Sequence, residues 1–374
     1  MRLSRKVLVG VVGASLLATA VATAVPPGRS DNISAVNQQL ISRDAGGGPA
    51  NGLAGEPTIS WDGRVARYVA YTSTATDIAA SNGRRNVFLV TRSGGSSGGS
   101  WKYGSTRLAS RGRNGAAANG DSFSPSLGGW SQGDRARRGK CLAFVSRASN
   151  LVAGDGNGRA DVFVRRLPGS RTRRMPSPAG TSATEVAVSG DCRTIAIVAG
   201  GTLYLKRGGG GLKKVAGGGV RSPSLSYNGA GLSYARGSGI YVRGRRGGAR
   251  KIAAGSNPAA EGGKPATPSR GRIRSVAYQR GGTVHYKDVG GKNRTVSTGA
   301  AAGQPSAGGG QVMFGSGPFV YLYAKSNNFG KTAPQGYCPP SQGNVTATYP
   351  SGRGNYIVFS CSGGLVYLSY LGGK

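Results

Sequence analysis

The sequence has 374 residues, and its 49 lysines and arginines outnumber its 13 aspartates and glutamates, which gives a formal net charge of +36. A single histidine and so few acids leave little material for acid–base or metal chemistry. Apolar residues make up 37%, enough for a packed core, while 68 glycines and 18 prolines indicate a turn-rich chain. The longest apolar stretch lies at the very start, which excludes a membrane protein with several spans.

The first residues have the pattern of an export signal. Arg2, Arg5 and Lys6 form a cationic start, and an apolar run follows over residues 7–22. Ala22-Thr23-Ala24 then offers the small residues that a signal peptidase requires.

We therefore expect a signal peptide over residues 1–24 and a flexible linker over residues 25–37. The protein would be secreted, to the extracellular space, the periplasm or the cell envelope, with no membrane span after cleavage. The alternative is a leader that stays uncleaved as an anchor helix, because the apolar run is close to the lower limit for spanning.

A short strand pattern recurs along the rest of the chain: an aliphatic residue, a small or aliphatic residue and, in most copies, an aromatic residue. The copies are Val69-Ala70-Tyr71, Leu142-Ala143-Phe144, Ile195-Ala196-Ile197, Leu232-Ser233-Tyr234, Val276-Ala277-Tyr278, Val312-Met313-Phe314 and Ile357-Val358-Phe359. Turn-rich segments, most of them containing a proline, precede the copies and start at positions 57, 125, 186, 223, 265, 305 and 347. The last five starts are spaced by about 40 residues, as in the four-stranded blades of a β-propeller.

Two further strands follow these copies. The first is present in every copy, as Val87-Phe88-Leu89, Val162-Phe163-Val164, Leu203-Tyr204-Leu205, Ile240-Tyr241-Val242, Val284-His285-Tyr286, Val320-Tyr321-Leu322 and Val366-Tyr367-Leu368. The second is more basic and closes five copies, as Arg107-Leu108-Ala109, Arg173-Arg174-Met175, Lys213-Lys214-Val215, Arg250-Lys251-Ile252 and Arg294-Thr295-Val296. Short strands separated by Gly-rich turns are typical of antiparallel hairpins.

The sequence thus predicts an all-β, closed propeller as a single domain over residues 38–374. We expect seven four-stranded blades; six is the alternative, because the copy after Pro305 has no clear fourth strand. The last copy also lacks an outer strand, while Gln38-Gln39-Leu40-Ile41-Ser42 resembles the outer strand Thr106-Arg107-Leu108-Ala109-Ser110. Placing this N-terminal strand in the last blade would close the ring and leave no sheet interface open.

Four cysteines fit an exported protein in an oxidising compartment. Four cysteines allow three pairings, and the repeat phase favours Cys141–Cys192 and Cys338–Cys361. A zinc site is the alternative, but no CxxC pair exists and the one histidine is distant.

The Pro-Ser-Leu-Ser turn that precedes a Val-Ala-Phe-like strand resembles the TolB-type, WD40-like (PD40) propeller repeat of exported bacterial proteins. Residues 150–164 match that repeat best, and the resemblance covers about residues 38–374. It implies a fold and a habit of binding partners, and it implies no reaction.

Each residue suited to chemistry has a structural interpretation beside the functional one. His285 occupies the position of an aromatic residue in the repeat and is expected to be a half-buried ring. Asp155, Asn157 and Asp161 resemble a calcium loop, but Arg159 stands where such a loop needs an oxygen donor, so a turn is expected. The sequence assigns no catalytic, cofactor-binding or metal-binding residue.

The large excess of positive charge is not required by a protein that serves only as a scaffold. The basic residues of the predicted outermost strands are candidates for polyanion binding: Arg107, Arg173, Arg174, Lys213, Lys214, Arg250 and Lys251. Their alternative function is to protect exposed strand edges from aggregation. That alternative explains the placement of the cations but not the shortage of acids.

We therefore expect an exported, monomeric binding or scaffold module for an acidic polymer or an acidic envelope protein. No recognised nucleic-acid module is visible, and export separates the chain from the cytoplasmic pool, so nucleic acid is not the expected partner. The alternative function is a polysaccharide lyase or hydrolase whose acids, drawn from several blades, converge at the central channel.

Overall fold

The computed structural model describes residues 37–60, 66–92, 106–129, 140–169, 171–178, 180–261, 273–296, 302–308, 311–324, 334–351 and 356–371. The predicted signal peptide over 1–24 and all but the last residue of the predicted linker lie outside these ranges.

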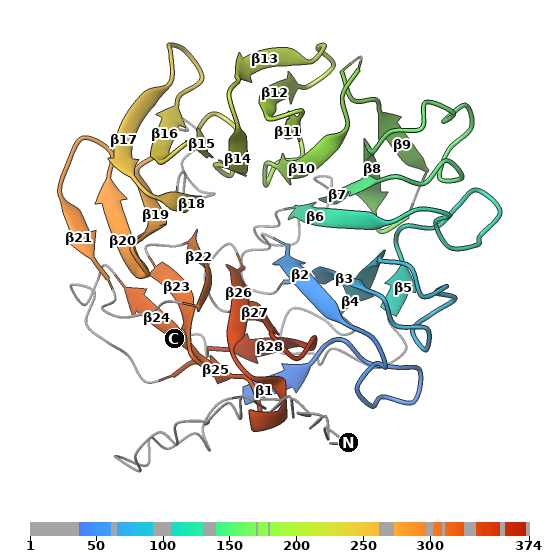
Figure 1. Ribbon diagram of the computed structural model, residues 1–374. Helices are drawn as coiled ribbons and strands as arrows, with labels where there is room; N and C mark the ends of the chain where they lie inside the picture. The colour runs from blue at the N-terminus through green and yellow to red at the C-terminus, as the bar shows by residue number, and fades with distance from the viewer. Residues whose placement is uncertain are drawn as a thin grey trace, which may run out of the picture.

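The described residues form seven four-stranded antiparallel blades arranged in a ring (Figure 1). One parallel bridge, between Gln304 and Ala347, joins the sixth and seventh blades into a continuous eight-stranded sheet. From the channel outward, the first blade consists of β2 (Ala54–Ile59), β3 (Tyr68–Ser73), β4 (Asn86–Thr91) and β5 (Thr106–Leu108), and the second of β6 (Ser122–Gly128), β7 (Lys140–Ser146), β8 (Asp161–Leu167) and β9 (Thr172–Met175). The third blade consists of β10 (Ala183–Val188), β11 (Thr194–Ala199), β12 (Thr202–Arg207) and β13 (Lys213–Ala216), and the fourth of β14 (Val220–Leu225), β15 (Leu232–Arg236), β16 (Gly239–Arg243) and β17 (Arg250–Ala254).

The fifth blade consists of β18 (Ser256–Glu261), β19 (Ser275–Arg280), β20 (Thr283–Asp288) and β21 (Asn293–Thr295). The sixth consists of β22 (Ala302–Gly308), β23 (Gln311–Ser316), β24 (Phe319–Ala324) and β25 (Gly336–Tyr337), and the seventh of β26 (Val345–Pro350), β27 (Tyr356–Cys361), β28 (Val366–Tyr370) and β1 (Asn37–Leu40). A single turn of 3-10 helix, Pro340–Gln342, lies between β25 and β26. The seven-bladed prediction is confirmed, and the sixth blade obtains its fourth strand from the two-residue β25.

The recurring aliphatic-small-aromatic pattern forms the second strand of each blade. Every position of β3, β7, β11 and β27 is buried, because neighbouring blades cover both faces of these strands. A strand covered on both faces has no polar side, which explains why these segments read as continuous apolar runs.

Clusters of buried side chains fill all seven boundaries between neighbouring blades. At the first boundary, Ala70 of β3 lies in one cluster with Phe144 of β7. At the last boundary, Tyr71 of β3 lies in one cluster with Val358 of β27, so the seventh blade packs on the first. Burying one Val, Leu or Phe side chain contributes roughly 1.5–3 kcal/mol, so these boundaries are the main source of stability.

The N-terminal strand completes the last blade, as predicted. β1 pairs antiparallel with β28, in a register that sets Gln39 opposite Leu368. Gln38 also reaches the sixth blade: its Nε2 donates a 2.8 Å hydrogen bond to the Tyr337 carbonyl, and its Oε1 accepts one of 2.9 Å from the Tyr337 N–H. The first strand of the domain therefore contacts its last two blades.

Both expected disulfides are present, and each joins neighbouring blades. Cys141 of β7 bonds Cys192 in the turn between β10 and β11, and Cys338 after β25 bonds Cys361 of β27. Gly128 ends β6 beside the first bond, where an added Cβ would lie 2.8 Å from the Cys192 Sγ. The bond and the close packing around it thus require glycine at this position.

The Pro-Ser motif has a structural explanation that the sequence alone does not reveal. The hydroxyl after the proline accepts a backbone N–H bond from the next blade: Ser126 Oγ from Val188 at 3.0 Å, and Ser224 Oγ from Ala260 at 3.1 Å. The residue before the proline has a positive φ, at a bulge in the innermost strand; examples are Ser124 at 50° and Ser222 at 51°. Such a bulge redirects the side chain toward the neighbouring blade.

One expected repeat start is wrong. The sequence suggests position 265 for the fifth blade, but its innermost strand is β18, with Pro258 in the repeat position. Asn257 before it has the same positive φ, 48°, and Ala259 pairs with Ala277 as Thr58 pairs with Ala70 in the first blade. Position 265 lies outside the described residues, in the connection between β18 and β19.

Candidate functional site

The basic residues singled out in the sequence lie on the outermost strands of the first four blades. Arg107 is on β5, Arg173 and Arg174 are on β9, Lys213 and Lys214 are on β13, and Arg250 and Lys251 are on β17. Six of the seven are exposed, and Arg174 is half-buried. Within the described ranges, none of the six exposed cations forms an ion pair.

Arg174 differs from the other six because two carboxylates engage it. Its Nε lies 2.6 Å from Asp161 Oδ2, and its Nη2 lies 3.1 Å from Asp155 Oδ1. Asp161 also accepts hydrogen bonds from the Asn157 side chain at 3.0 Å and the Ser177 N–H at 2.5 Å. The oxygens that a calcium ion would need are thus bonded to protein donors, as expected for a turn.

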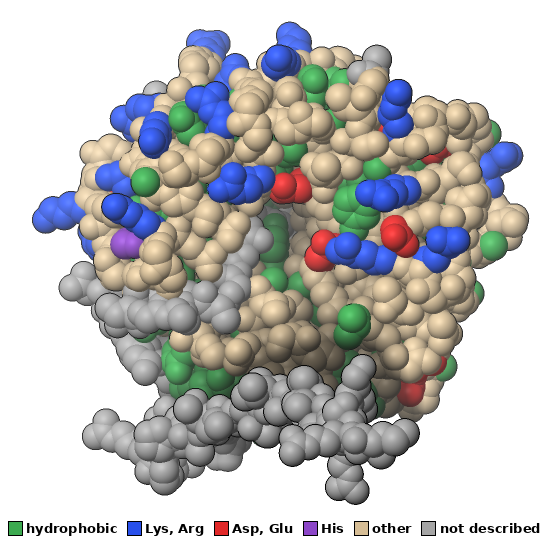
Figure 2. Space-filling view, viewed as in Figure 1, with side chains coloured by type: hydrophobic (Ala, Val, Ile, Leu, Met, Phe, Trp, Pro, Cys, Tyr) green, Lys and Arg blue, Asp and Glu red, His purple; other side chains and the backbone are tan. Residues whose placement is uncertain are grey.

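The exposed cations are unevenly distributed around the ring. β1 and β25 are outermost strands too, yet they contain no Lys or Arg, and Arg294 of β21 pairs with Asp288 at 2.9 Å. Figure 2 shows Lys and Arg side chains over the part of this face that holds β9, β13 and β17, and also over the fifth blade, beside the histidine. Edge protection applies equally to every outer strand. Among the described outermost strands, the exposed cations lie on those of the first four blades, and edge protection alone does not explain this distribution.

Two acids lie at bulges of innermost strands. Glu56 of β2 pairs with Arg85 and accepts a 2.8 Å hydrogen bond from the Ser124 N–H of the second blade. Glu185 of β10 accepts a 2.8 Å bond from the Ser222 N–H of the fourth blade. Figure 2 shows acidic side chains next to basic ones around the hollow at the centre of the ring. Both carboxylates therefore join neighbouring blades.

The pKa of the Glu185 carboxyl is raised above its ordinary value of 4.5, chiefly because burial disfavours the charged form. The Ser222 hydrogen bond and the Arg221 charge oppose the rise in pKa, and the negative charge of Glu56 adds to it. Glu56 and Glu185 are thus two acids of innermost strands, in the first and third blades, whose charges act on each other, as the acids of a polysaccharide-cleaving enzyme at the channel would. Asp62 and the side chain of Glu261 lie outside the described residues.

His285 takes the place of an aromatic residue, as expected. It lies opposite Tyr278 in the β19–β20 register and stacks on it, with ring centroids 5.3 Å apart and planes inclined by 18°. Tyr71 and Phe88 form the matching pair in the first blade, at 5.7 Å and 25°. Burial, and then the charge of Arg280, lower the pKa of His285, so the neutral ring is favoured.

Clusters of metal-ligating side chains and membrane-spanning helices are both absent from the described residues. No three His, Cys, Asp or Glu side chains among them are close enough together to hold a metal ion. Among the described residues there is also no helix with the length and apolar character needed to cross a bilayer.

Sequence reasoning missed several residues that the fold brings into contact with the predicted ones. Arg111 and Arg165 lie beside Arg107 at one cavity, although they belong to a loop and to the next blade. Glu56 also escaped notice, because its partner Arg85 lies in the loop before β4 and no motif links the two. The signal that could have been noted is the pair Arg165-Arg166 near the end of β8, directly after the apolar run Val162-Phe163-Val164.

Comparison of the chain with models of known protein families and with curated proteins found no match. The structure therefore characterises the chain by its architecture, as a seven-bladed β-propeller with exposed cations on the outermost strands of the first four blades and two disulfides between blades.

Proposed function

We propose that this chain is an exported propeller of the TolB-like type, which acts as a monomeric binding module for an acidic polymer or acidic protein of the cell envelope. The Pro-Ser-Leu repeat, in which Ser126 and Ser224 join neighbouring blades, supports the TolB-like assignment. Two disulfides support export, because such bonds persist mainly in oxidising compartments.

The observation that carries the proposal is the composition of β13 and β17. Lys213, Lys214, Arg250 and Lys251 are all exposed on these neighbouring outer strands, and none forms an ion pair within the described ranges. A flexible acidic chain lying along this rim would contact all four cations and release its own counterions. Arg guanidinium groups add bidentate contacts to phosphate or carboxylate.

The test is retention of the protein, purified from residue 25 onward, on a heparin-like or teichoic-acid-like resin over a salt series. We expect strong retention at low salt. Elution should follow as the salt concentration rises through about 0.15 M, where the screening length is about 8 Å. The rim variant replaces four cations by glutamine: Lys213→Gln, Lys214→Gln, Arg250→Gln and Lys251→Gln. It should elute at clearly lower salt, and the dependence of log affinity on log salt should flatten by roughly 0.7–0.9 per lost contact.

A matched control removes the same charge from exposed arginines away from the outer strands: Arg84→Gln, Arg147→Gln, Arg159→Gln and Arg193→Gln. This control variant should elute nearly with the wild type. Equal loss in the two variants would show that net charge alone governs retention, and would contradict a rim site. Absence of retention by the wild type at low salt would remove the polyanion proposal altogether.

A further inference from the structure

A cavity of about 320 Å³ opens between the first two blades, at the outer edge of the ring. Strands β4 and β5 and the connection that follows β5 form one wall, and the end of β8 forms the other. Leu89, Leu108 and Leu167 are buried side chains that line it. Because these leucines exclude water, charges at the cavity act through a lower dielectric than charges on open surface.

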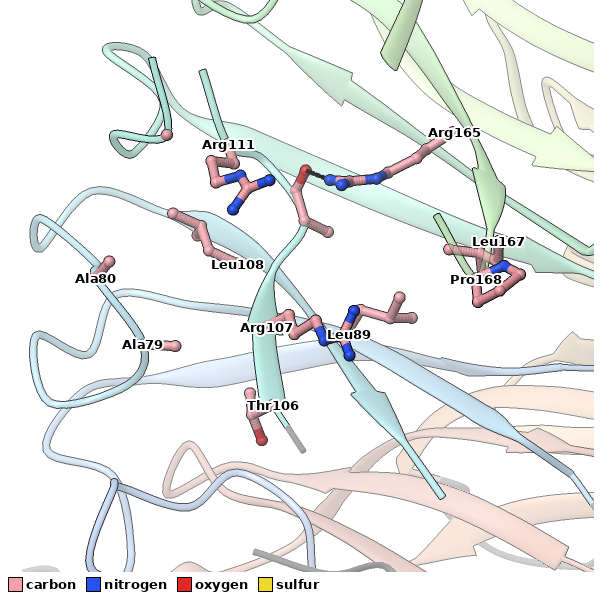
Figure 3. Close-up of a pocket in the computed structure, with 12 residues that line it drawn as sticks. Ala79, Ala80, Leu89, Thr106, Arg107, Leu108, Arg111, Arg165, Leu167 and Pro168 are labelled. Atoms are coloured by element: carbon pink, nitrogen blue, oxygen red, sulfur yellow. Dashed lines mark hydrogen bonds between the residues drawn. The ribbon is translucent and has the colours of Figure 1, made fainter. Parts of the chain in front are cut away.

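Three arginines from separate parts of the fold surround this cavity. Arg107 comes from β5, Arg111 from the loop after β5, and Arg165 from β8 in the next blade. Figure 3 shows the guanidinium groups of Arg111 and Arg165 directed toward each other, and that of Arg107 apart from them, beside Leu89. Three blade elements thus place three guanidinium groups around one space.

Among the described residues, most donors of these three arginines have no hydrogen-bond acceptor. Arg165 Nη1 donates one long hydrogen bond, 3.4 Å, to the Ala109 carbonyl, although a guanidinium carries five N–H donors. In the part of the chain that the structure describes, none of the three forms an ion pair with an acid. Burial lowers the pKa of Arg165, and the positive charges of Arg111 and Arg107 lower it further.

Like charges held together without a counterion repel one another, and a bound anion would relieve that repulsion. The backbone that carries Arg111 is fixed, because Arg111 pairs with Ala117 and the Gly112 N–H donates a 2.8 Å bond to the Ala116 carbonyl. Arg165 is fixed by its strand. Little backbone ordering would then be needed on binding, which favours affinity.

We propose that this three-arginine cavity, lined by Arg107, Arg111 and Arg165, binds one phosphate or sulfate group. Guanidinium groups match such oxyanions bidentately, and donors from three arginines that line one cavity in different directions suit a tetrahedral anion better than a planar carboxylate. The volume is at the lower end of the range of ligand pockets, about 300–1,000 Å³, so it holds a single group with a few attached atoms.

Two sources supply this chemistry: a free inorganic anion, and a phosphate or sulfate group carried by an acidic polymer. For the polymer source, the inference rests on the proposed function, since the rest of the polymer would extend from the cavity along the basic outer strands, to which Arg107 belongs. For the free anion, the inference stands alone.

The test is isothermal titration of the protein, from residue 25 onward, with inorganic phosphate, with sulfate and with chloride at matched low ionic strength. We expect saturable binding of one phosphate or sulfate per chain and none of chloride. Arg111→Gln and Arg107→Gln change exposed side chains and should each weaken phosphate binding about tenfold or more. Arg113→Gln, an exposed arginine two residues from Arg111 that does not line the cavity, is the matched control and should bind as the wild type does.

A glycerol phosphate oligomer, titrated in parallel, distinguishes the two sources. Binding of the oligomer more tightly than inorganic phosphate, and its loss in Arg111→Gln, assigns the cavity to the polymer; equal affinities assign it to the free anion. Titrations without saturation for both phosphate and sulfate, or equal weakening by Arg113→Gln, would overturn the inference. If the wild type is retained on the resin but binds no phosphate, the proposed function stands and the cavity site is refuted. If it binds phosphate but is not retained, the cavity site stands and the polymer-binding function is refuted.

Discussion

The backbone N–H of Ser222 donates a 2.8 Å hydrogen bond to Oε2 of Glu185, across the boundary between the third and fourth blades. Burial of this carboxylate raises its pKa above the ordinary value of 4.5. A raised pKa in the folded state means that Glu185 stabilises the fold fully when protonated, below about pH 4.5, and that this contribution is lost as the pH rises through the raised pKa.

Replacing Glu185 by glutamine keeps the acceptor oxygen and removes the buried charge. We therefore expect Glu185→Gln to unfold at a higher urea concentration than the wild type at pH 7, with the difference shrinking as the pH falls toward 4.5. Glu185→Ala removes the acceptor and should lower the free energy of unfolding by about 1–3 kcal/mol, because the Ser222 N–H loses its partner. A glutamine variant that is less stable than the wild type at pH 7 would contradict the dominance of burial.

His285 predicts a pH dependence of the opposite sign. Burial lowers its pKa, so the stability that its neutral ring contributes is present above the ordinary value of 6.5 and is lost as the pH falls through the lowered pKa. His285→Phe introduces the residue that stacks at this position in the first two blades, as Phe88 and Phe163. We expect it to match the wild type near pH 7.5 and to exceed it at mildly acid pH, in urea unfolding followed by tryptophan fluorescence.

Tyr204→Phe is the control for this experiment, since Tyr204 holds the same register position in the third blade. It should leave the difference between pH 7.5 and acid pH unchanged. A His285→Phe variant with the pH profile of the wild type would show that His285 does not cause the acid sensitivity.

The two disulfides close chain segments of different length, 51 residues for Cys141–Cys192 and 23 for Cys338–Cys361. In the chain-entropy account each bond stabilises by about 3–4 kcal/mol, somewhat more for the longer segment. We expect the double alanine variant of the 141–192 pair to lose more stability than that of the 338–361 pair, measured by urea unfolding without reductant. Mass spectrometry of non-reduced peptides checks the pairing, and alkylation of all four thiols without reductant would refute it.

Gln38 predicts a local test of ring closure. Its amide group makes two hydrogen bonds with the Tyr337 backbone, so Gln38→Ala should cost about 1–3 kcal/mol in the free energy of unfolding. Hydrogen exchange should rise in β1, β25 and β28 and stay unchanged in β10–β13 on the far side of the ring. Uniform protection across all blades in the variant would show that this contact does not hold the closing strand.

Much of the fold was predictable because blade strands repeat. The apolar patterns at Val69-Ala70-Tyr71 and its copies give the blades, and the outer-strand likeness of Gln38–Ser42 gives the closure. β25 was not predictable, because two residues at Gly336–Tyr337 contain no strand pattern and are specified by pairing with Phe319 and Val320. The fifth innermost strand was misplaced because the chain offers three prolines near the expected spacing, Pro258, Pro265 and Pro268, and only the pairing of Ala259 with Ala277 decides among them.

The binding residues were predictable only in part. Outer-strand cations such as Lys213 and Arg250 follow from repeat phase, since an outermost strand has one free edge. The ion pair between Arg174 and Asp161 could not be predicted, because it depends on how a β9 side chain reaches the start of β8 in the folded second blade. The cavity of Arg107, Arg111 and Arg165 did not follow either, because its members come from two blades whose packing the repeat does not encode.

The pairing of β1 with β28 has a consequence for how the molecule is made. Ser42 and Val366, joined by a 2.9 Å hydrogen bond, are 324 residues apart, so the earliest strand synthesised has no partner until nearly the whole chain has emerged. At roughly 5–20 residues per second, that wait lasts on the order of tens of seconds. Throughout it, β28 of one molecule and β1 of another can meet, and strand exchange between nascent copies competes with self-closure. The ring is therefore most prone to misassembly while it is being synthesised, before β28 is available to pair with β1.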